Sequence, residues 1–534
     1  MFSTIDFAGY FESLFATGGL AYVALGLFVF FALSVLWGAL RGGSRGASRQ
    51  ILHIIFTAGA GVIAFFLCTW LTGQLAVHTD GKTVGDVIRE LQASGILTEI
   101  AESDVIGLDS YDGETLKYLL ALPLATVAVP VLFIVLFFVI DLVIKLIYLL
   151  VCAIAGLHRH GGFLKKAGGF LIGACEGVIF AALILVPVFS VSRTVTTAAD
   201  QLREEEAAAD FVAISDECFS FISDSPLAEI MMSCGGDMLM EKLSTVDLGG
   251  ESLDLRGELV NGIRMGVIST KLSGTNWSEL SDADKAVLDQ LLAELDSSEY
   301  MRTLFAGILR GTATAVEDGF IPFKAEPPYD RMVVELLHIF ETSTAGNITA
   351  DLTTVKDIVY LLSDDGVLVA ISTGDSSVLT NALTAVDGNG ETTVKRAITI
   401  MKANPRTASL VSTLTEFSVA MLSSSLGLGD DAGEVYESVK SGVVDVLSID
   451  RNQYETSDEY VAAVSGELDA KLKENDIELE PEIIDEMAQN IYENELDLGE
   501  ITEETVDDVI LSYYDAYLKG QLELPSEPSD EPEV

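Results

Sequence analysis

The sequence predicts an all-α membrane protein, with a four-helix transmembrane bundle followed by a large, all-helical extracytoplasmic domain. The chain of 534 residues combines a formal net charge of −50 with a mean hydropathy of +0.39. These values coexist because the charge is segregated along the chain. Residues 1–192 hold only 13 of the 81 acidic and 10 of the 31 basic side chains. The apolar excess therefore precedes residue 192, and the negative charge follows it.

Four apolar stretches are long enough to cross a bilayer, which takes about 20 helical residues. They cover approximately residues 20–40, 51–72, 121–151 and 167–192. The first stretch is not expected to be a cleaved signal peptide, because the residues before it carry Asp6 and Glu12 and no basic side chain. Residues 1–195 are thus predicted to form the membrane domain.

Basic side chains in two short loops predict how the chain is oriented in the membrane, and these side chains are expected to contact lipid headgroups. They are Arg41, Arg45, Arg49, Arg159, Lys165 and Lys166. The loop at 73–120 is acidic instead. Because cytoplasmic loops are enriched in Lys and Arg, the chain is expected to be a multi-pass protein of the cell membrane with its N-terminus and its C-terminal domain outside.

The first basic loop, GALRGGSRGASRQ at residues 38–50, superficially resembles a phosphate-binding loop. A Walker-type loop needs a Lys-Ser/Thr pair after a buried strand, and a dinucleotide fingerprint needs a βαβ unit. Neither context is present, because a membrane-length helix precedes the loop. The sequence therefore predicts a turn whose arginines set the topology, and no bound nucleotide or other cofactor.

The membrane domain resembles the colicin V production protein (CvpA) family over about residues 18–195. One part of the resemblance is WGALRGGSRGASRQI, which is similar to the Gly/Arg hairpin between helices one and two of that family. The other is GGFLIGACEGVIF, which is similar to the glycine-spaced run that opens helix four. The resemblance implies a bacterial cell-envelope location and an association with toxin production, rather than a particular reaction.

Small residues and charges inside the predicted spans are candidate functional positions. Gly169, Gly173, Gly177 and Ala181 form a small-xxx-small ladder that predicts close helix packing, within the bundle or across a dimer. Glu176 lies deep in the fourth helix, where a carboxylate needs a partner. Lys145, with Asp141 one turn away on the third helix, is expected at a similar depth. The sequence therefore predicts a Lys145–Glu176 ion pair, which either fixes helix register or marks an ion path.

Residues 196–520 are predicted to form the acidic helical domain, and residues 521–534 a disordered acidic tail. The negative charge argues against nucleic acid as a partner and favours weak, nonspecific cation binding. No catalytic or metal-binding motif is recognised, and His338 lies in an apolar helix typical of a core or half-buried position. Cys218 and Cys234 lie in the soluble part, and the sequence leaves open whether they pair.

Two functional hypotheses follow. The first is a non-enzymatic envelope scaffold, associated with toxin production or secretion, that presents its acidic domain to an unknown protein partner. The alternative is a transporter or channel component that uses Asp141, Lys145 and Glu176.

Overall fold

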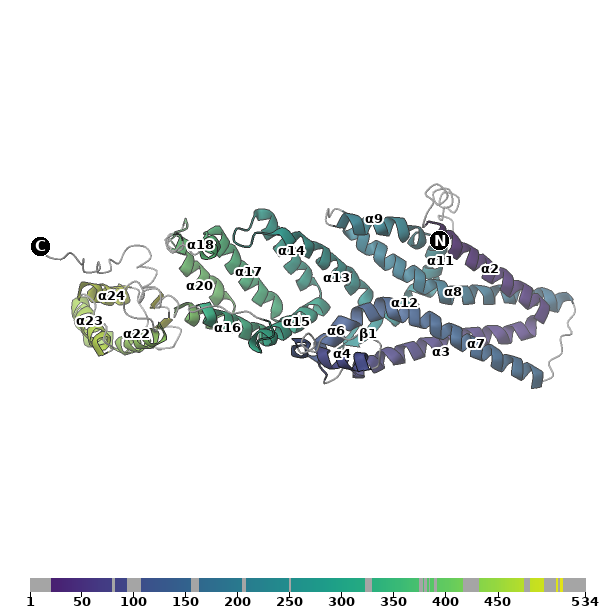
Figure 1. The fold of residues 1–534 in the computed structure, drawn as a ribbon, viewed down its shortest axis with the longest axis horizontal. Coiled ribbons are helices and arrows are strands. Elements are labelled where there is room, and N and C mark those ends of the chain that lie inside the picture. Colours follow the sequence, from purple (N-terminus) through teal and green to yellow (C-terminus); the bar gives the residue numbers. More distant parts are fainter. Residues whose placement is uncertain are drawn as a thin grey trace. The chain divides into compact units, whose positions relative to one another are not determined.

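The structure is a computed structural model. It describes residues 21–78, 82–93, 107–154, 163–203, 208–248, 251–321, 329–373, 378, 382–383, 385–388, 391–415, 432–474, 481–493, 506–507 and 510–511. The predicted tail at 521–534 lies outside the described residues, as does Arg159. Almost every described element is a helix, so the all-α prediction is confirmed at this level (Figure 1).

Four helical stretches at the N-terminal side are long and apolar enough to cross a membrane, as predicted. They are α2 (Ala21–Arg45), α3 (Ala47–His78), the joined helices α6 (Gly113–Pro123) and α7 (Val129–Ile154), and α8 (Phe163–Gln201). A π-helical turn, Leu124–Ala128, joins α6 to α7. Each stretch is longer than its apolar sequence alone indicated, because the polar residues at its ends continue the helix.

The junction between α2 and α3 corrects one expectation. Residues 41–50 are helical rather than an open loop, except at Gly46, whose φ of +82° ends α2. Only glycine adopts this left-handed conformation without steric cost. Arg45 therefore belongs to the last turn of α2, with Arg41 one turn before it, and Arg49 belongs to the first turn of α3.

Glycines bring α2 and α8 together along the predicted ladder. A Cβ added at Gly173 would lie 2.9 Å from the Cα of Gly42, and one added at Gly42 would lie 2.8 Å from the Cα of Gly173. A Cβ added at Gly38 would lie 3.1 Å from the Cα of Gly177, one added at Gly177 would lie 2.7 Å from the Cα of Val35, and Ala181 is fully buried. Backbones approach this closely only where side chains are absent. The ladder therefore packs inside the bundle, which is the first of the two arrangements predicted for it.

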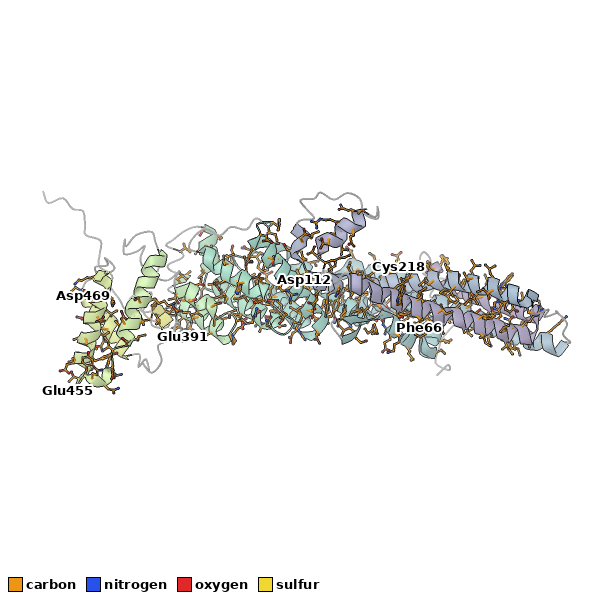
Figure 2. All side chains as sticks on the ribbon, turned by 90° about the horizontal axis from the view of Figure 1, so that it is seen from below. Phe66, Asp112, Cys218, Glu391, Glu455 and Asp469 are labelled. Atoms are coloured by element: carbon orange, nitrogen blue, oxygen red, sulfur yellow. The ribbon has the colours of Figure 1, made fainter. Side chains whose placement is uncertain are left out.

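Large apolar side chains cover the outside of the bundle. Phe66 on α3 (Figure 2), Trp37 on α2 and Leu171 on α8 are each more than 60% exposed. Phe133 and Phe137 on α7 are fully buried in its centre. An apolar exterior over a packed apolar core is what a bilayer, rather than water, stabilises.

The core of the bundle continues into the helices that follow α8. These are α9 (Ala209–Cys218), α10 (Ser220–Ser223), α11 (Pro226–Met231), a π-helical turn η5 (Met232–Gly236) and α12 (Asp237–Ser244). Leu227, Met232 and Met240 share one hydrophobic cluster with Phe133 and Phe189. One compact unit accordingly comprises Met1–Ser273 and Ala293–Ile308, so the expected membrane domain is part of a larger unit.

A short β-hairpin is the main departure from the all-α expectation. Strands β1 (Thr245–Leu248) and β2 (Glu251–Asp254) pair antiparallel. In the sequence two glycines separate the strands, a pair that two-residue hairpin loops favour. Each strand has four residues, too few for a recognisable alternating pattern. Asp254 then caps α13 (Leu255–Thr270) by accepting a hydrogen bond from the backbone N–H of Arg256.

Other elements of this unit lie between the spans and after α13. Helix α4 (Val84–Ala93) and the 3-10 turn η2 (Gly107–Ser110) fall within the sequence expected as the 73–120 loop. Arg89 on α4 binds Asp109 on η2 with two N–H donors, at 2.9 and 2.6 Å. Tyr300, which is 1% exposed, donates its hydroxyl hydrogen to the carbonyl of Tyr118 on α6.

The second compact unit comprises Gly274–Leu292 and Leu309–Val534. Its helices are parts of α14 (Asp282–Ser297) and α15 (Glu299–Glu317), then α16 (Tyr329–Glu341), α17 (Ile348–Asp364), α18 (Val367–Thr373), α20 (Thr393–Ala403), α22 (Ala432–Leu447), α23 (Ser457–Glu474) and α24 (Pro481–Glu493). Two hydrophobic clusters hold them, one centred on α16–α20 and one on α22–α24. His338, expected to be in the core or half-buried, is instead exposed beside Glu341.

Candidate functional site

A stripe of polar side chains on α3 faces the interior of the bundle. Gln50, His53 and Thr57 follow the spacing i, i+3, i+7, which places them on one face of the helix. None is more than 1% exposed. Burying three polar side chains in an apolar bundle is unfavourable unless they have partners or a function.

Glu176 on α8 is the main partner of this stripe. Its Oε1 atom lies 2.6 Å from Nδ1 of His53, and its Oε2 atom accepts a hydrogen bond from the amide of Gln50. The carboxylate is 7% exposed. The Gln50 donor and the close His53 ring, both from α3, therefore compensate part of the cost of placing a carboxylate at this depth.

Helix α7 contributes the remaining charges. Lys145 forms an ion pair with Asp141, one turn away on the same helix, and its Nζ lies 5.2 Å from the centre of the Phe180 ring. The predicted direct ion pair between Lys145 and Glu176 is therefore wrong. The physical reason is that α3 packs along both α7 and α8 and supplies the donors for Glu176, while Asp141 satisfies Lys145.

Aromatic contacts connect this cluster to α2. The ring of Tyr148 on α7 meets the His53 ring edge-on, with centroids 5.2 Å apart. The guanidinium carbon of Arg45 lies 5.7 Å from the centre of the same Tyr148 ring. Arg45 therefore faces the bundle, unlike the lipid-headgroup position predicted for it. We call the set of Gln50, His53, Thr57, Asp141, Lys145, Tyr148 and Glu176 the intramembrane polar cluster.

Several buried atoms of the intramembrane polar cluster have no hydrogen-bond partner among the described residues. They are Gln50 Oε1, both ring nitrogens of His53, Thr57 Oγ1 and Asp141 Oδ1. Buried polar atoms in proteins are nearly always hydrogen-bonded, so this concentration of polar atoms distinguishes the cluster from the apolar core around it.

The other predicted site residues lie outside this cluster. Lys166 is exposed near the start of α8, and Lys165 lies in the first turn of that helix. Cys68, Cys175, Cys218 and Cys234 are free, so Cys218 and Cys234 do not pair. In the described part of the chain, no group of three or more His, Cys, Asp or Glu residues is arranged to hold a metal ion.

Sequence reasoning missed His53, Gln50, Thr57 and Tyr148. The detectable signal was the motif Gln-x-x-His-x-x-x-Thr inside an otherwise apolar span, because three polar residues on one helical face seldom face lipid. The carboxylates alone did not reveal which helix would satisfy them.

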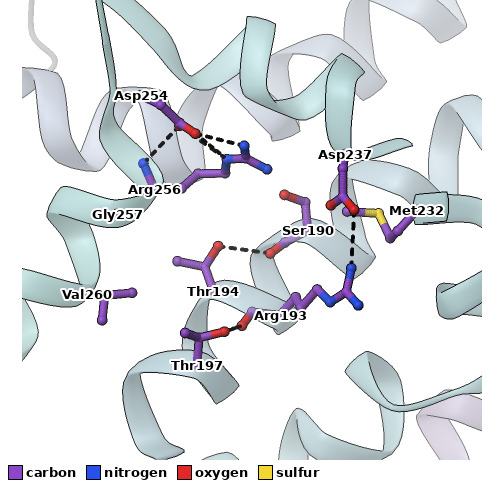
Figure 3. A pocket seen from close by; sticks show the side chains of 10 residues that line it. All are labelled: Ser190, Arg193, Thr194, Thr197, Met232, Asp237, Asp254, Arg256, Gly257 and Val260. Atoms are coloured by element: carbon purple, nitrogen blue, oxygen red, sulfur yellow. Dashed lines mark hydrogen bonds and ion pairs between the residues drawn. The ribbon is translucent and has the colours of Figure 1, made fainter. Parts of the chain in front are cut away.

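A second polar feature is a pocket of about 240 Å³ between α8, α12 and α13 (Figure 3). Arg193 on α8 approaches Asp237 at 3.4 Å, whereas Arg256 binds Asp254 at 2.7 Å. Ser190, Thr194 and Thr197 line the α8 side. Since each arginine already faces a carboxylate, the pocket has little excess charge of either sign.

Asp254 gives this pocket a defined pH dependence. Burial by itself raises the pKa of Asp254, but hydrogen bonds from Arg256 and Ser244 lower that pKa below its ordinary value. A carboxylate with a lowered folded-state pKa contributes stability above about pH 4, its unfolded pKa, and loses it as the pH falls through the folded pKa.

We therefore expect Arg256→Gln to destabilise the protein at pH 7 and to have progressively less effect as the pH falls below about 4, because protonation of Asp254 removes the charge that Arg256 binds. Thermal unfolding of the detergent-solubilised chain between these pH values measures the difference. Arg193→Gln, which removes the longer and more exposed contact, is the matched control and should change little. An Arg256→Gln effect that is constant with pH contradicts this assignment.

Comparison with protein-family models, with curated proteins and with solved structures finds no match to this chain.

Proposed function

We propose that this chain is a non-enzymatic, multi-pass protein of the cell membrane that presents an acidic helical region outside the cell. It acts as a scaffold in the envelope, in the class of toxin-production or secretion-associated proteins that the colicin V production resemblance implies. The negative charge beyond residue 192 and the basic ends of the spans support this orientation.

One observation carries the scaffold proposal. Helix α8 runs without interruption from Phe163 to Gln201, and residues after it pack into the same core as the spans. Helices α10–α12, which share this core, are therefore held against the spans. Fixed presentation is what a scaffold requires and what a flexible linker does not provide.

The orientation is tested by labelling intact cells or spheroplasts with a membrane-impermeant maleimide. Cys234 is exposed and free, so an outside location predicts that it reacts before lysis. Cys234→Ser is the control that identifies the labelled position. Labelling only after lysis reverses the proposed orientation.

The partner is tested by photo-crosslinking in intact membranes from an exposed position of the second compact unit. Val334 on α16 is 57% exposed and suits a photoreactive replacement. We expect a discrete protein adduct that depends on this position, with Phe66, on the apolar exterior of the bundle, as the comparison position. If crosslinking from Val334 gives only lipid adducts, or no adduct at all, the scaffold proposal is contradicted.

A transporter or channel component remains the second candidate, favoured by the intramembrane polar cluster. Asp141 and Glu176 are both less than 8% exposed inside the bundle, and unsatisfied polar atoms surround them. Charges at this depth commonly mark ion or proton paths. The test is the flux of ions or protons into proteoliposomes that contain the protein. Flux that is abolished by Glu176→Gln supports this candidate, and the absence of flux with the unaltered protein contradicts it.

A further inference from the structure

We infer that a groove on the apolar exterior of the membrane bundle holds an acyl chain of an anionic phospholipid, and that Lys242 binds the phosphate of this lipid. The groove lies between α3, α8 and α12 and has a volume of about 490 Å³. That volume falls within the range of small-molecule sites, about 300–1,000 Å³. The inference goes beyond both functional proposals, because it depends neither on a scaffold role nor on ion transport.

Three helices form the walls of this lipid groove. Val62 and Phe66 line it from α3, Leu183 from α8, and Met238 and Leu239 from α12. Helix α12 packs against both α3 and α8 and closes the third side (Figure 1). An acyl chain in the groove therefore contacts protein on three sides, whereas a chain beside a single helix contacts it on one. More contacts mean more dispersion attraction, which is what favours packing inside a bilayer.

Two glycines shape the lipid groove. At its floor, a Cβ added to Gly61 would lie 2.8 Å from Cδ1 of Leu183, so α3 and α8 are closely packed there. Gly235 has a φ of +114°, a conformation that glycine adopts without steric cost, and it precedes α12. A Cβ added to Gly235 would meet nothing within 4 Å. The groove is thus packed at its floor and open beside the turn that leads into α12.

The residues at the mouth of the lipid groove are large, apolar and exposed. Val62 is 54% exposed, Phe66 is 64% exposed and Met238 is 66% exposed. Val62 and Phe66 belong to a stretch of α3 that is long and apolar enough to cross a membrane. The medium that surrounds such a stretch in a bilayer is hydrocarbon. The groove therefore opens toward acyl chains.

Lys242 gives the lipid groove a single positive charge. It is exposed, it lies in the last turn of α12, and it is the charged residue among those that line the groove. No carboxylate of the described residues forms an ion pair with it. The acidic residues of α12, Asp237 and Glu241, do not line the groove, and Asp237 faces Arg193 at 3.4 Å.

The position of Lys242 along α12 matches the structure of a phospholipid. Lys242 follows Met238 by one helical turn and precedes strand β1, which begins at Thr245, by three residues. A lysine stem lies along apolar surface while its ammonium group remains at a polar boundary. An ammonium group is also a strong donor to phosphate oxygens. An apolar groove with an unpaired cation at one end is therefore complementary to an acyl chain joined to a phosphate.

The inference is tested by photolabelling the full chain in proteoliposomes with phospholipids that carry a diazirine on an acyl chain. The probes are phosphatidylglycerol, which is anionic, and phosphatidylcholine, whose choline offsets the phosphate charge. Mass spectrometry of the peptides locates the adducts. With phosphatidylglycerol we expect adducts to concentrate around Met238 and Phe66 rather than around Val131, which is 56% exposed on α7 and does not line the groove.

Lys242→Gln tests the role of the charge. It should lower labelling of the groove by phosphatidylglycerol about fivefold, the effect of one basic residue on an anionic lipid, and change labelling by phosphatidylcholine little. Lys242→Arg should retain most of the labelling. Lys395→Gln, at an exposed lysine of the second compact unit, is the control for the same change in net charge. Equal labelling by the two lipids, or labelling that Lys242→Gln does not alter, overturns the inference.

Val62→Trp tests the role of the groove itself. The indole occupies volume that the acyl chain needs, so labelling around Met238 should be lost. Val131→Trp, at a similarly exposed valine outside the groove, should leave that labelling intact. If both variants label alike, the adducts come from lipid that covers the whole bundle, and the inference is wrong. If Val62→Trp does not fold, the Lys242→Gln comparison decides, because it alters only an exposed side chain.

The absence of groove labelling by either lipid in the unaltered chain also overturns the inference. Native mass spectrometry of the same protein then determines whether a second copy of the chain occupies the groove, since a dimer has twice the mass of the monomer.

Discussion

Gly173→Ala is expected to destabilise the membrane bundle by about 1–3 kcal/mol, the usual cost of overpacking a core. The added methyl would lie 2.9 Å from both the carbonyl carbon of Gly38 and the Cα of Gly42. Both are backbone atoms, which cannot rotate away, so α2 and α8 must separate along their contact. Thermal unfolding of the purified chain in detergent or bilayer discs measures the loss.

Gly26 and Gly59 provide matched controls for this prediction, since a Cβ at either meets nothing within 4 Å. Alanine there should be neutral or stabilise by up to about 1 kcal/mol, because glycine is the weaker helix former. Equal unfolding temperatures for Gly173→Ala and Gly26→Ala would show that the α2–α8 contact is not this close.

Arg406→Ala is expected to destabilise the second compact unit by about 3–5 kcal/mol, the range for breaking a buried ion pair from one side. Asp351 on α17 is fully buried, and Nε of Arg406 binds its Oδ2 at 3.0 Å. Arg406 also donates to the carbonyl of Ile339 at 2.6 Å, which joins α16 to the same network. Without the arginine, the carboxylate retains only the Asn404 amide as a strong donor.

The measurement is the unfolding of the full chain by denaturant or heat, monitored with a spectroscopic probe placed in the second compact unit. Lys473→Ala is the matched control: its pair with Asp469 is solvent-exposed, and such pairs contribute about 0–1 kcal/mol. A double variant, Arg406→Ala with Asp351→Leu, should recover part of the loss because no buried charge remains. An Arg406→Ala effect no larger than that of Lys473→Ala contradicts the assignment.

The sequence predicted best those features that depend on a single physical requirement, such as the length needed to cross a bilayer or the small side chains needed for close helix packing. Apolar length predicted the four spans, and the spacing of Gly169, Gly173 and Gly177 predicted a close-packed face. It did not identify Gly38 and Gly42 as the opposite side of that face, because a single helix does not reveal its neighbour. The two glycine-containing motifs on which the family resemblance rests turn out to be in contact with each other.

The candidate site was predicted in part. Asp141, Lys145 and Glu176 were selected because charge is unfavourable in a bilayer, and all three belong to the intramembrane polar cluster. Their partners were assigned incorrectly, since depth along two helices does not determine which third helix lies between them. His53 was missed because a lone histidine in an apolar helix is most often structural; only the contact with Glu176 distinguishes it.

The length of α8 has a mechanical consequence. Glu176 and Thr197 lie on this one helix about 32 Å apart, at about 1.5 Å per residue. Pro187 lies between them and is the most compliant joint, because it lacks the N–H that would bond the carbonyl four residues earlier. A tilt of about 5° at that joint moves the Thr197 end by about 1 Å, at a lever arm of about 15 Å. Helix α8 therefore has the form of a lever, with the buried Glu176 carboxylate on one arm and the arginine-lined pocket on the other.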